Sequence, residues 1–535
     1  MTGGNPRLSG GPSRKRARRA RRPSGKLGGV SASPSSGRVR LLPLDRTLEL
    51  PLGQPLREAL FAHGVEFPCG GRGRCKGCRV RVLRGELPPT AEDRARLTES
   101  ELAAGWRLGC RAVVRGDLTL EVGQWETPVL SDDSRLEFPP RDGLGVAVDL
   151  GTTTLAVQLL DLATGHVLGV ETALNAQAVH GADVMSRLHF AVHERGGGTL
   201  CRLIREQIGG LVTNLGAADD RLARLREIVL VGNAAMQHLF CGWDATPLAE
   251  APFEPKPHDE ARFTTAELGW PGAATVRFLP GMGGFVGSDV LAGVLATGLH
   301  RSERLAALID LGTNGEIVVG HRERILCAST AAGPAFEGAT IRMGMRATTG
   351  AITEVTRRDG RLECRVLGGG APRGICGSGL VDAVAGALEL GLITPAGRIA
   401  GDRPLELLPP VTLDPRDVRE LQLAKGAIAA GVRLLAGRFP GGLDAIGAVH
   451  LAGAFGNYIS RANARRIGLL PFPPEQVIPA GNTALLGAKM VLLRAVDFAA
   501  LWPELRLRVE HVPLNEDLRF HEVYVQEMAF PPRES

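Results

Sequence analysis

Four cysteines near the amino terminus constrain this chain more than any other feature. They are Cys69, Cys75, Cys78 and Cys110, and they read C-x5-C-x2-C-x31-C. Four thiolates can hold an iron–sulfur cluster, and the surrounding glycines let a tight loop turn its backbone N–H groups towards inorganic sulfide. A close triplet followed by one distant cysteine is the 2Fe–2S ferredoxin pattern, although plant-type proteins have four residues in the first gap. Structural zinc and disulfides remain alternatives. Zinc sites usually contain two CxxC pairs, and only Cys75 and Cys78 form one here.

The residues around these cysteines are typical of a small β-grasp ferredoxin spanning 39–127. Its expected elements are a hairpin, a helix, a strand, a helical stretch and two further strands: 38–43 with 46–51, 55–63, 78–83, 91–104, 108–114 and 118–122. The strand over 108–114 is expected to carry Cys110, so that backbone packing fixes the distance of the fourth ligand from the loop. A polar, proline-containing linker is expected over 128–142.

Basic residues are concentrated in the first 38 positions, which contain ten Lys and Arg and no acid. Subtracting these ten from the formal charge of +6 leaves −4 for the remaining chain. The positive net charge of the whole chain therefore comes from this tail and does not describe the folded part. The tail has too few large apolar residues to form a core and is expected to be disordered. A nucleic-acid-binding arm is the alternative that we disfavour.

Several observations bear on location. No apolar region follows the arginine pairs as an export signal would require, and no run approaches 18 consecutive apolar residues. The chain has nine cysteines, of which four are assigned to a cluster and five are scattered, and this usage fits a reducing compartment. We therefore expect a cytoplasmic protein.

A second signal occurs twice beyond the linker. Asp149 ends an apolar strand and is followed by Gly151, Thr152 and Thr153; Asp310 ends another and is followed by Gly312, Thr313 and Asn314. Such a hairpin offers backbone N–H and hydroxyl donors to phosphate oxygens, while the carboxylate can hold a metal-bound water. One copy is weak evidence, because the hairpin could be purely structural. Two copies predict the duplicated α/β lobes of an actin-like (ASKHA) nucleotide-binding fold, one over 143–300 and one over 301–535.

A third element of this kind is an apolar strand beginning at Ala448 that ends in small residues, including Gly453 and Gly456. In an actin-like fold the equivalent turn receives adenosine, because small residues permit close approach to the ribose and base. The predicted fold class is thus a multidomain α/β and α+β protein: a β-grasp ferredoxin, a linker and duplicated ATPase lobes.

With a ferredoxin module, a linker and ATPase lobes in this order, the chain resembles the reductive activators of corrinoid proteins, which are ferredoxin-fused ATPases. The resemblance runs from about 39 to 532 and includes six further stretches: 231–238, 285–289, 329–338, 374–379, 421–425 and 451–456. It implies that the four cysteines ligate a 2Fe–2S cluster and that the two Asp-Gly loops bind ATP with Mg²⁺. Gly453 and Gly456 become adenosine contacts, and Glu316 becomes an acid that positions water or metal.

The implied function is ATP-dependent return of Co(II) to Co(I) in a corrinoid protein of a methyltransferase system. An upstream electron donor and a homodimer are implied as well. A sugar-kinase-like enzyme, an activator of the 2-hydroxyacyl-CoA dehydratase type, and an electron carrier with a non-hydrolysing body are the alternatives. Among other residues, Glu316 could be a solvated strand acid, and Asp289 and Glu337 could cap helices. Cys376 is expected to be a small buried residue and His238 a packed or capping one.

Overall fold

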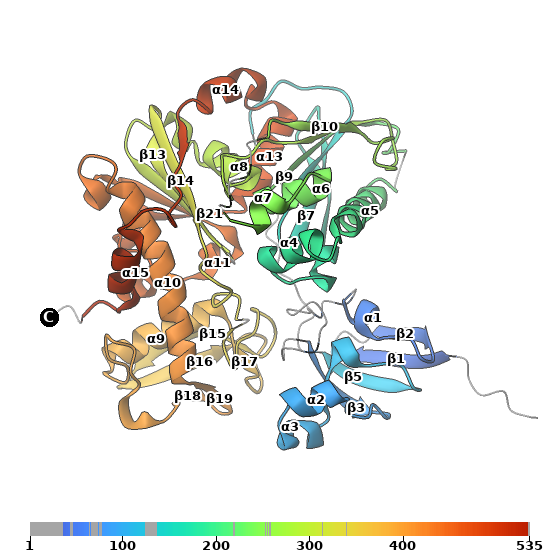
Figure 1. The fold of residues 1–535 in the computed structure, drawn as a ribbon, viewed down its shortest axis with the longest axis vertical. Coiled ribbons are helices and arrows are strands. Elements are labelled where there is room, and N and C mark those ends of the chain that lie inside the picture. The colour runs from blue at the N-terminus through green and yellow to red at the C-terminus, as the bar shows by residue number, and fades with distance from the viewer. Residues whose placement is uncertain are drawn as a thin grey trace, which may run out of the picture.

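The structure is a computed structural model that describes most of the chain (Figure 1). The described residues are 36–42, 46–61, 63, 65, 73, 78–122, 136–217, 220–251, 253, 255, 258–312, 314–338 and 340–532. Most of the predicted basic tail, Cys69, Cys75 and Thr313 lie outside them. Within these ranges no helix is both long enough and apolar enough to cross a lipid bilayer.

A five-stranded sheet forms the ferredoxin module, by which we mean elements β1 to β5 and the helices between them. Its strand order is β2-β1-β5-β3-β4. The strands are β1 (Ser36–Leu42), β2 (Arg46–Pro51), β3 (Arg79–Arg84), β4 (Trp106–Leu108) and β5 (Leu118–Val122). The predicted hairpin is confirmed, since β1 and β2 pair antiparallel. Helix α1 (Arg57–Phe61) lies within the predicted helix, and Leu56 and Leu60 are fully buried.

Two predictions in this module were wrong in detail. The helical stretch 91–104 is split into α2 (Ala91–Arg96) and α3 (Glu99–Ala103), because Thr98 leaves the helical conformation and caps the second helix by accepting from the N–H of Glu101. Cys110 is not in a strand. It lies in a 3-10 turn, Gly109–Arg111, that directly follows β4.

The first lobe is built on a six-stranded sheet of order β10-β11-β9-β6-β7-β8. Its strands are β6 (Leu144–Leu150), β7 (Thr154–Asp161), β8 (Val167–Leu174), β9 (Leu225–Gly232), β10 (Ala261–Thr264) and β11 (Thr275–Phe278). One face packs with a layer of four helices: α4 (Val184–Val192), α5 (Gly197–Leu215), α6 (Ala234–Cys241) and α7 (Thr246–Ala249). The central strands β6 and β9 are buried on both faces, as expected for the middle of a sheet covered on both sides.

The second lobe repeats this plan with a sheet of order β21-β20-β12-β13-β14-β22. Its strands are β12 (Ala306–Leu311), β13 (Gly315–His321), β14 (Arg324–Thr330), β20 (Ala448–Ala452), β21 (Val477–Gly481) and β22 (Val509–His511). In both lobes an antiparallel hairpin, β6–β7 or β12–β13, lies beside a parallel strand, β9 or β20. The predicted duplication is therefore confirmed.

An insertion between β14 and β20 extends the second lobe. It contains strands β15 (Ala351–Arg358), β16 (Arg361–Val366), β17 (Gly374–Ile375), β18 (Leu405–Leu408) and β19 (Val411–Leu413). Helices α9 (Gly377–Glu389) and α10 (Pro415–Ala436) belong to it, and α10 packs against β13 and β14. Four further helices of this lobe follow β20: α11 (Gly453–Tyr458), α12 (Arg461–Arg466), α14 (Phe498–Leu505) and α15 (Phe520–Met528), the last packed on α10.

Two helices lie between the sheets and join the lobes. Helix α8 (Ser288–Thr297) and helix α13 (Thr483–Leu493) pack against each other in one apolar cluster with residues of β6, β9, β12 and β13. Although α13 comes from the C-terminal part of the chain, it contacts β6 and β9 of the first lobe. The fold therefore places C-terminal residues beside the first predicted phosphate loop.

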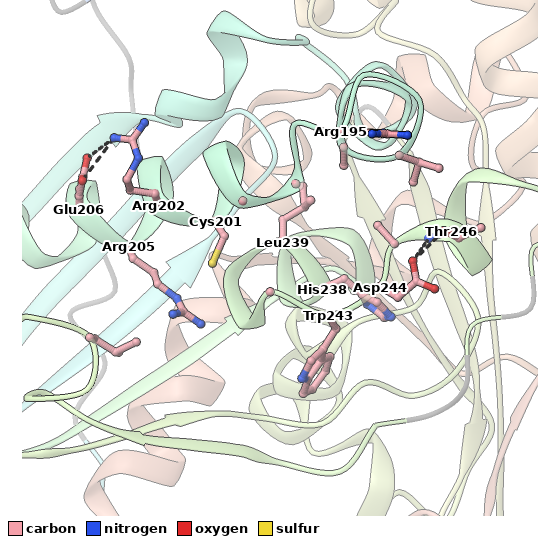
Figure 2. A pocket seen from close by; sticks show the side chains of 17 residues that line it. Arg195, Cys201, Arg202, Arg205, Glu206, His238, Leu239, Trp243, Asp244 and Thr246 are labelled. Carbon is pink, nitrogen blue, oxygen red and sulfur yellow. Dashed lines mark hydrogen bonds and ion pairs between the residues drawn. The ribbon is translucent and has the colours of Figure 1, made fainter.

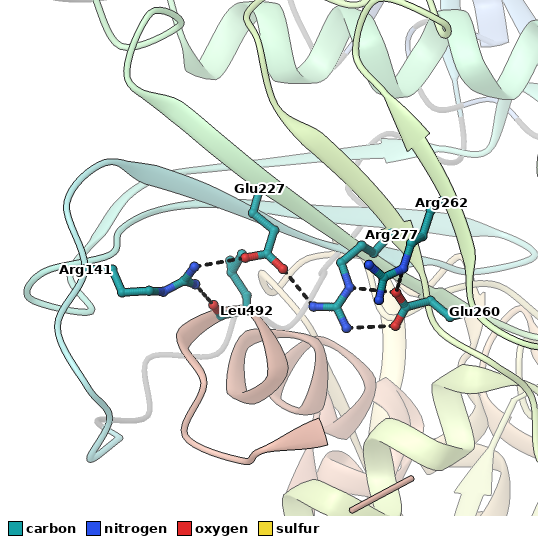
Figure 3. A network of polar contacts seen from close by, with 6 residues as sticks. All are labelled: Arg141, Glu227, Glu260, Arg262, Arg277 and Leu492. Atoms are coloured by element: carbon teal, nitrogen blue, oxygen red, sulfur yellow. Dashed lines mark hydrogen bonds and ion pairs between the residues drawn. The ribbon is translucent and has the colours of Figure 1, made fainter. Parts of the chain in front are cut away.

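An ion-pair network fixes the segment that enters the first sheet (Figure 3). Arg141, within the predicted linker, pairs with Glu227 at 3.1 Å and donates to the carbonyl of Leu492 on α13. Glu227 also accepts from Arg277 at 2.7 Å, and Arg277 pairs with Glu260 at 2.7 Å. Since these side chains are largely withdrawn from solvent, the network holds the end of the predicted linker against the body.

Candidate nucleotide site and cluster site

The first predicted phosphate loop is a tight turn between two buried strands. Asp149 lies at the end of β6, and the N–H of Gly151 bonds to the carbonyl of Thr154 at 3.1 Å. Gly151, Thr152 and Thr153 are partly exposed. The buried strands fix the turn, while its hydroxyls stay accessible to a ligand.

Three asparagines hold this turn in the same way. Each caps a helix with its side-chain oxygen and donates its side-chain N–H to the first loop. Asn175 donates to the carbonyl of Gly151 at 2.9 Å, Asn233 to Oγ1 of Thr152 at 2.8 Å, and Asn482 to Oδ2 of Asp149 at 2.9 Å. Their oxygens accept from backbone N–H groups of Gln177, Met236 and Leu485. An amide side chain suits this arrangement because its acceptor and its donor are separate atoms on one short group.

None of these asparagines was among the predicted site residues. Their sequence signal is the helix cap, an Asn directly before a helix, which is too common to mark a site. Asn175 and Asn482 come from turns far from Asp149 in the sequence, so only the folded chain brings them to the loop.

The second loop occupies the same position in its lobe as the first. Asp310 ends β12 and is paired across the hairpin with Glu316 of β13, and the N–H of Gly312 bonds to the carbonyl of Asn314 at 3.1 Å. Glu316 accepts from the hydroxyl of Ser329 at 3.4 Å. The residue between Gly312 and Asn314, predicted to bind phosphate, is not among the described ones.

Four carboxylates gather between the loops: Asp149, Asp289, Asp310 and Glu316. Burial raises the pKa of Asp149 and of Asp310 to about 6 each, and the charge of Asp149 contributes to the shift at Asp310. Burial also raises the pKa of Glu316 well above its usual range, with added repulsion from Asp289 and Asp310. Glu316 is therefore not a freely solvated strand acid. Within the described ranges no Lys or Arg forms an ion pair with any of the four.

Asp289 joins this cluster because the start of α8 is tied to the end of β9. The hydroxyl of Ser288 bonds to both the N–H and the carbonyl of Gly232, each at 3.1 Å. Burial raises the pKa of Asp289 to about 7, and the nearby Asp310 and Asp149 add to the shift. The sequence left open whether this acid merely caps a helix, and the structure places it among the site carboxylates.

The residues predicted to contact adenosine lie beside the second loop. Gly453 has a φ of +84°, and a Cβ there would lie 2.6 Å from Oδ1 of Asp310. Gly456 packs closely on β20, since its Cβ would lie 2.9 Å from Cγ of Leu451. Glycine is required at Gly453 both for the backbone conformation and for this close approach.

A cavity of about 830 Å³ adjoins this glycine motif, between the insertion and α11 to α12. Asp382 and Asn463, which bond at 2.7 Å, lie on its wall, as does Tyr458, which is 58% exposed. A smaller neighbouring cavity shares Ser378 and Tyr458 with it and is also lined by Thr153, Glu337 and Cys376. The two cavities thus connect the first loop with the glycine motif. Cys376 is buried, as predicted.

These residues fit a nucleotide with a divalent cation. The paired loops offer hydroxyl and N–H donors, the glycine motif permits close approach, and the acid cluster has no described basic partner. In the described part of the chain no three His, Cys, Asp or Glu side chains are arranged as a complete metal cage. Mg²⁺ usually takes one or two carboxylates together with water and substrate phosphates, so this incomplete donor set suits it.

The cluster site is described in part. Cys78 and Cys110 are buried in the module, and the N–H of Gly109 bonds to the carbonyl of Cys78 at 2.9 Å. That bond places the two ligand-bearing segments side by side. Soft thiolates on adjacent backbone segments fit an iron–sulfur cluster, whose other two predicted ligands lie outside the described residues.

A further cavity, of about 720 Å³, lies on the helical face of the first lobe (Figure 2). It is lined by Arg195, Cys201, Arg205 and Trp243, and by none of the predicted site residues. His238 is buried there and its Nδ1 lies 2.8 Å from the carbonyl of Ala234, which confirms that it is a packed residue.

Comparison with known proteins agrees with this architecture. Models described as 2Fe-2S iron-sulfur cluster binding domain, RACo middle region, and C-terminal domain of RACo the ASKHA domain match residues 39–115, 144–302 and 304–535. A corrinoid activation enzyme, RamQ, from Eubacterium limosum is 35% identical over 420 residues, which cover 72% of this chain and 70% of that protein. The chain belongs to the family of reductive activators of corrinoid proteins.

Two other members of this family are similar to the chain. A reductase of a methylated amine-specific Co(II) corrinoid protein from Methanosarcina barkeri is 27% identical over 420 residues, which cover 72% of this chain and 77% of that protein. A solved structure titled as a reductive activator for a corrinoid, iron-sulfur protein has a TM-score of 0.64 and 26% identity. The matched region covers 93% of this chain and 99% of the chain in that structure. The 2Fe–2S cluster and ATP are thus the cofactors of this architecture.

Proposed function

We propose that this chain is an ATP-dependent reductive activator that returns the cobalt of a corrinoid protein from Co(II) to Co(I). The observation that carries the proposal is the presence, in one chain, of two buried cysteines on adjacent segments and of two Asp-Gly loops with four acids that form no ion pair with a described Lys or Arg. The named relatives activate or reduce corrinoid proteins, and their names support a partner of the same class. We further propose a ferredoxin domain over 39–127, a linker over 128–142, and lobes over 143–300 and 301–535.

The bound cluster supplies a single electron, which reduces one Co(II) to Co(I). The chain itself provides Cys69, Cys75, Cys78 and Cys110 as ligands and keeps the described pair away from water. Plant-type clusters have potentials of about −400 mV, and each further ~59 mV by which an acceptor is lower disfavours one-electron transfer about tenfold. ATP therefore has to favour a state of the complex in which the acceptor is reduced more easily.

Residues of both lobes have defined roles in this proposal. Gly151, Thr152, Thr153, Gly312, Thr313 and Asn314 bind phosphate oxygens. Asp149, Asp310 and Glu316 position the divalent cation or a water, with Asp289 beside them. Gly453 and Gly456 border the adenosine. The asparagine caps keep the first loop in place. A homodimer, a cytoplasmic location and an upstream low-potential donor belong to the same proposal.

The test is a reduction assay with a purified Co(II) corrinoid protein, a low-potential reductant and this chain. We expect the Co(I) absorption band to appear only when ATP and Mg²⁺ are both present. Asp310→Asn should abolish the effect of ATP while leaving the cluster spectrum intact. Formation of Co(I) at the same rate without nucleotide would contradict the proposal.

A further inference from the structure

Among the described residues, two polar contacts, here called anchors, join the ferredoxin module to the lobes, one to the first lobe and one to the second. In the first, the guanidinium of Arg57 on α1 donates to the carbonyl of Val179. In the second, Nη2 of Arg373 pairs with Oε1 of Glu121 on β5 at 3.1 Å. Figure 1 shows the module lying across from both lobes, with α1 near the first and the module beside the sheet that contains β15 and β17.

The first anchor is adjacent to the first phosphate loop. Val179 ends a 3-10 turn, Ala176–Val179, that is capped by Asn175. The backbone N–H of Asn175 bonds to the carbonyl of Thr153 at 2.8 Å, and its side chain bonds to Gly151. A displacement of the loop is therefore passed to Val179 through one short turn.

The second anchor is adjacent to the cavity on the adenosine side. Arg373 directly precedes β17, and the chain then continues into Cys376, Gly377 and Ser378, which line the cavity shared with Thr153. This segment has little freedom, because a Cβ on Gly377 would lie 2.0 Å from the carbonyl oxygen of Phe336. A change at the cavity wall is therefore passed to Arg373.

On the module, both anchors lie next to segments that carry cluster ligands. Leu56, which precedes Arg57, donates its N–H to the carbonyl of Ala112 at 2.9 Å, two residues beyond Cys110. Glu121 pairs across the sheet with Arg81 of β3, the strand that begins directly after Cys78. The docking contacts are thus made close to the redox site.

We propose that this two-lobed surface is a docking site for the chain's own ferredoxin module and that nucleotide in the cleft controls its occupancy. A module that bridges two bodies can engage both anchors in only one arrangement of those bodies. Nucleotide held between the loops changes that arrangement, so one anchor is released and the module can reach a partner. This inference rests on the proposed nucleotide binding.

The anchors have the strength that reversible docking requires. Glu121 and Arg373 keep 25% and 27% of their side-chain surfaces exposed, and ion pairs with this much solvent contact contribute little stability and are screened by salt. A partly exposed ion pair of this kind is a contact that a bound nucleotide can reverse.

Hydrogen–deuterium exchange on the full cluster-containing protein tests this inference. The reporter is segment 53–61 with α1, because it belongs to the module and carries Arg57 of the first anchor. We expect slow exchange there without nucleotide, and a several-fold increase on addition of Mg²⁺ with a non-hydrolysable ATP analogue. Protection of segment 151–154 in the same samples reports nucleotide binding.

Variants at the ion pair make the test specific. Glu121→Arg should give fast exchange at 53–61 without nucleotide and no further response to it. Combining it with Arg373→Glu restores the ion pair with reversed charges and should restore slow exchange and the response. The control is Glu49→Arg on β2, whose ion pair with Arg38 at 3.8 Å lies elsewhere on the module and is exposed. It should behave as the native protein, and the cluster spectrum verifies that each variant is folded.

Two outcomes separate this inference from the proposed function. If 151–154 is protected but 53–61 does not respond, or if Glu121→Arg matches the native protein, the docking inference is wrong. If 151–154 gains no protection, the proposed nucleotide binding fails, and the nucleotide control of docking fails with it.

Discussion

Asn482 donates from Nδ2 to Oδ2 of Asp149 at 2.9 Å, a bond that joins residues 333 positions apart in the chain. Its other side-chain atom caps α13 by accepting from the N–H of Leu485 at 2.8 Å. The bond lowers the pKa of Asp149, which burial otherwise raises. The helix that connects the lobes is thereby coupled to the first phosphate loop through one side chain.

Replacing Asn482 separates these two roles. Asn482→Ser keeps an oxygen for the helix cap but removes the Nδ2 group that reaches Asp149, so MgATP affinity should fall about fivefold, the effect of losing a hydrogen bond worth ~1 kcal/mol. Asn482→Ala also removes the cap and should lower the free energy of unfolding by a further ~1 kcal/mol. Calorimetric titration and chemical denaturation measure the two effects. Equal stability of the two variants would contradict the capping role.

The acid cluster predicts how pH affects the nucleotide-free protein. Asp149 and Asp310 have pKa values of about 6 and Asp289 of about 7, above the usual value of 3.8. The native state therefore binds more protons than the unfolded state between about pH 4 and 7, and this contribution to stability declines as pH rises through that window. Affinity for Mg²⁺ with nucleotide should change oppositely, rising from pH 5 to 7 and then levelling.

Thermal unfolding with and without Mg²⁺ and nucleotide, measured across this pH range, checks the cluster. Asp289→Asn removes one of the repelling charges, so it should raise the melting temperature of the nucleotide-free protein near pH 7 and weaken the pH dependence. Glu323→Gln, at an exposed acid outside the cluster, is the matched control and should change neither. An unchanged pH profile in Asp289→Asn would exclude this residue from the cluster.

A substitution at Gly453 tests whether the glycine motif has to lie close to the second loop. Gly453→Ala would place a methyl 2.6 Å from Oδ1 of Asp310 at a φ of +84°, so we expect a loss of stability above ~1 kcal/mol and of most ATP binding. Gly442→Ala is the control: its φ is also positive, +56°, but a Cβ there meets nothing within 4 Å. The difference between the two variants isolates the steric effect from the backbone effect.

Replacing Cys110 should abolish electron delivery without affecting nucleotide binding. Cys110→Ser should remove the visible absorption of the cluster and the reduction of Co(II), because a ligand is lost, yet it should leave ATP affinity within about twofold. Cys376→Ser, at a buried cysteine of the body, should retain the cluster spectrum. Spectroscopy and calorimetric titration on both variants make the comparison. Retention of the 2Fe–2S spectrum in Cys110→Ser would show that this residue is not a ligand.

The sequence predicted the parts of this protein well where the signal was local. The β1–β2 hairpin, the two strand–turn loops at Asp149 and Asp310, and the small residues after β20 are each encoded within one short continuous stretch of the chain. Prediction from the sequence failed where a contact with a neighbouring residue decides the backbone conformation. Thr98 interrupts the helical stretch because it caps α3, and Cys110 leaves the strand because the chain turns at Gly109.

By itself the sequence determined the chemistry available to this protein: four thiols at ferredoxin spacing, two Asp-Gly loops, and the order in which they follow. Only the tertiary structure decided which groups act together. Asp289 joins the acids because Ser288 bonds to the end of β9, and Asn482 reaches Asp149 because α13 returns to the first lobe. The physical reason is that spacing along a chain specifies local backbone geometry, whereas the electrostatics of a site depend on which distant elements pack together.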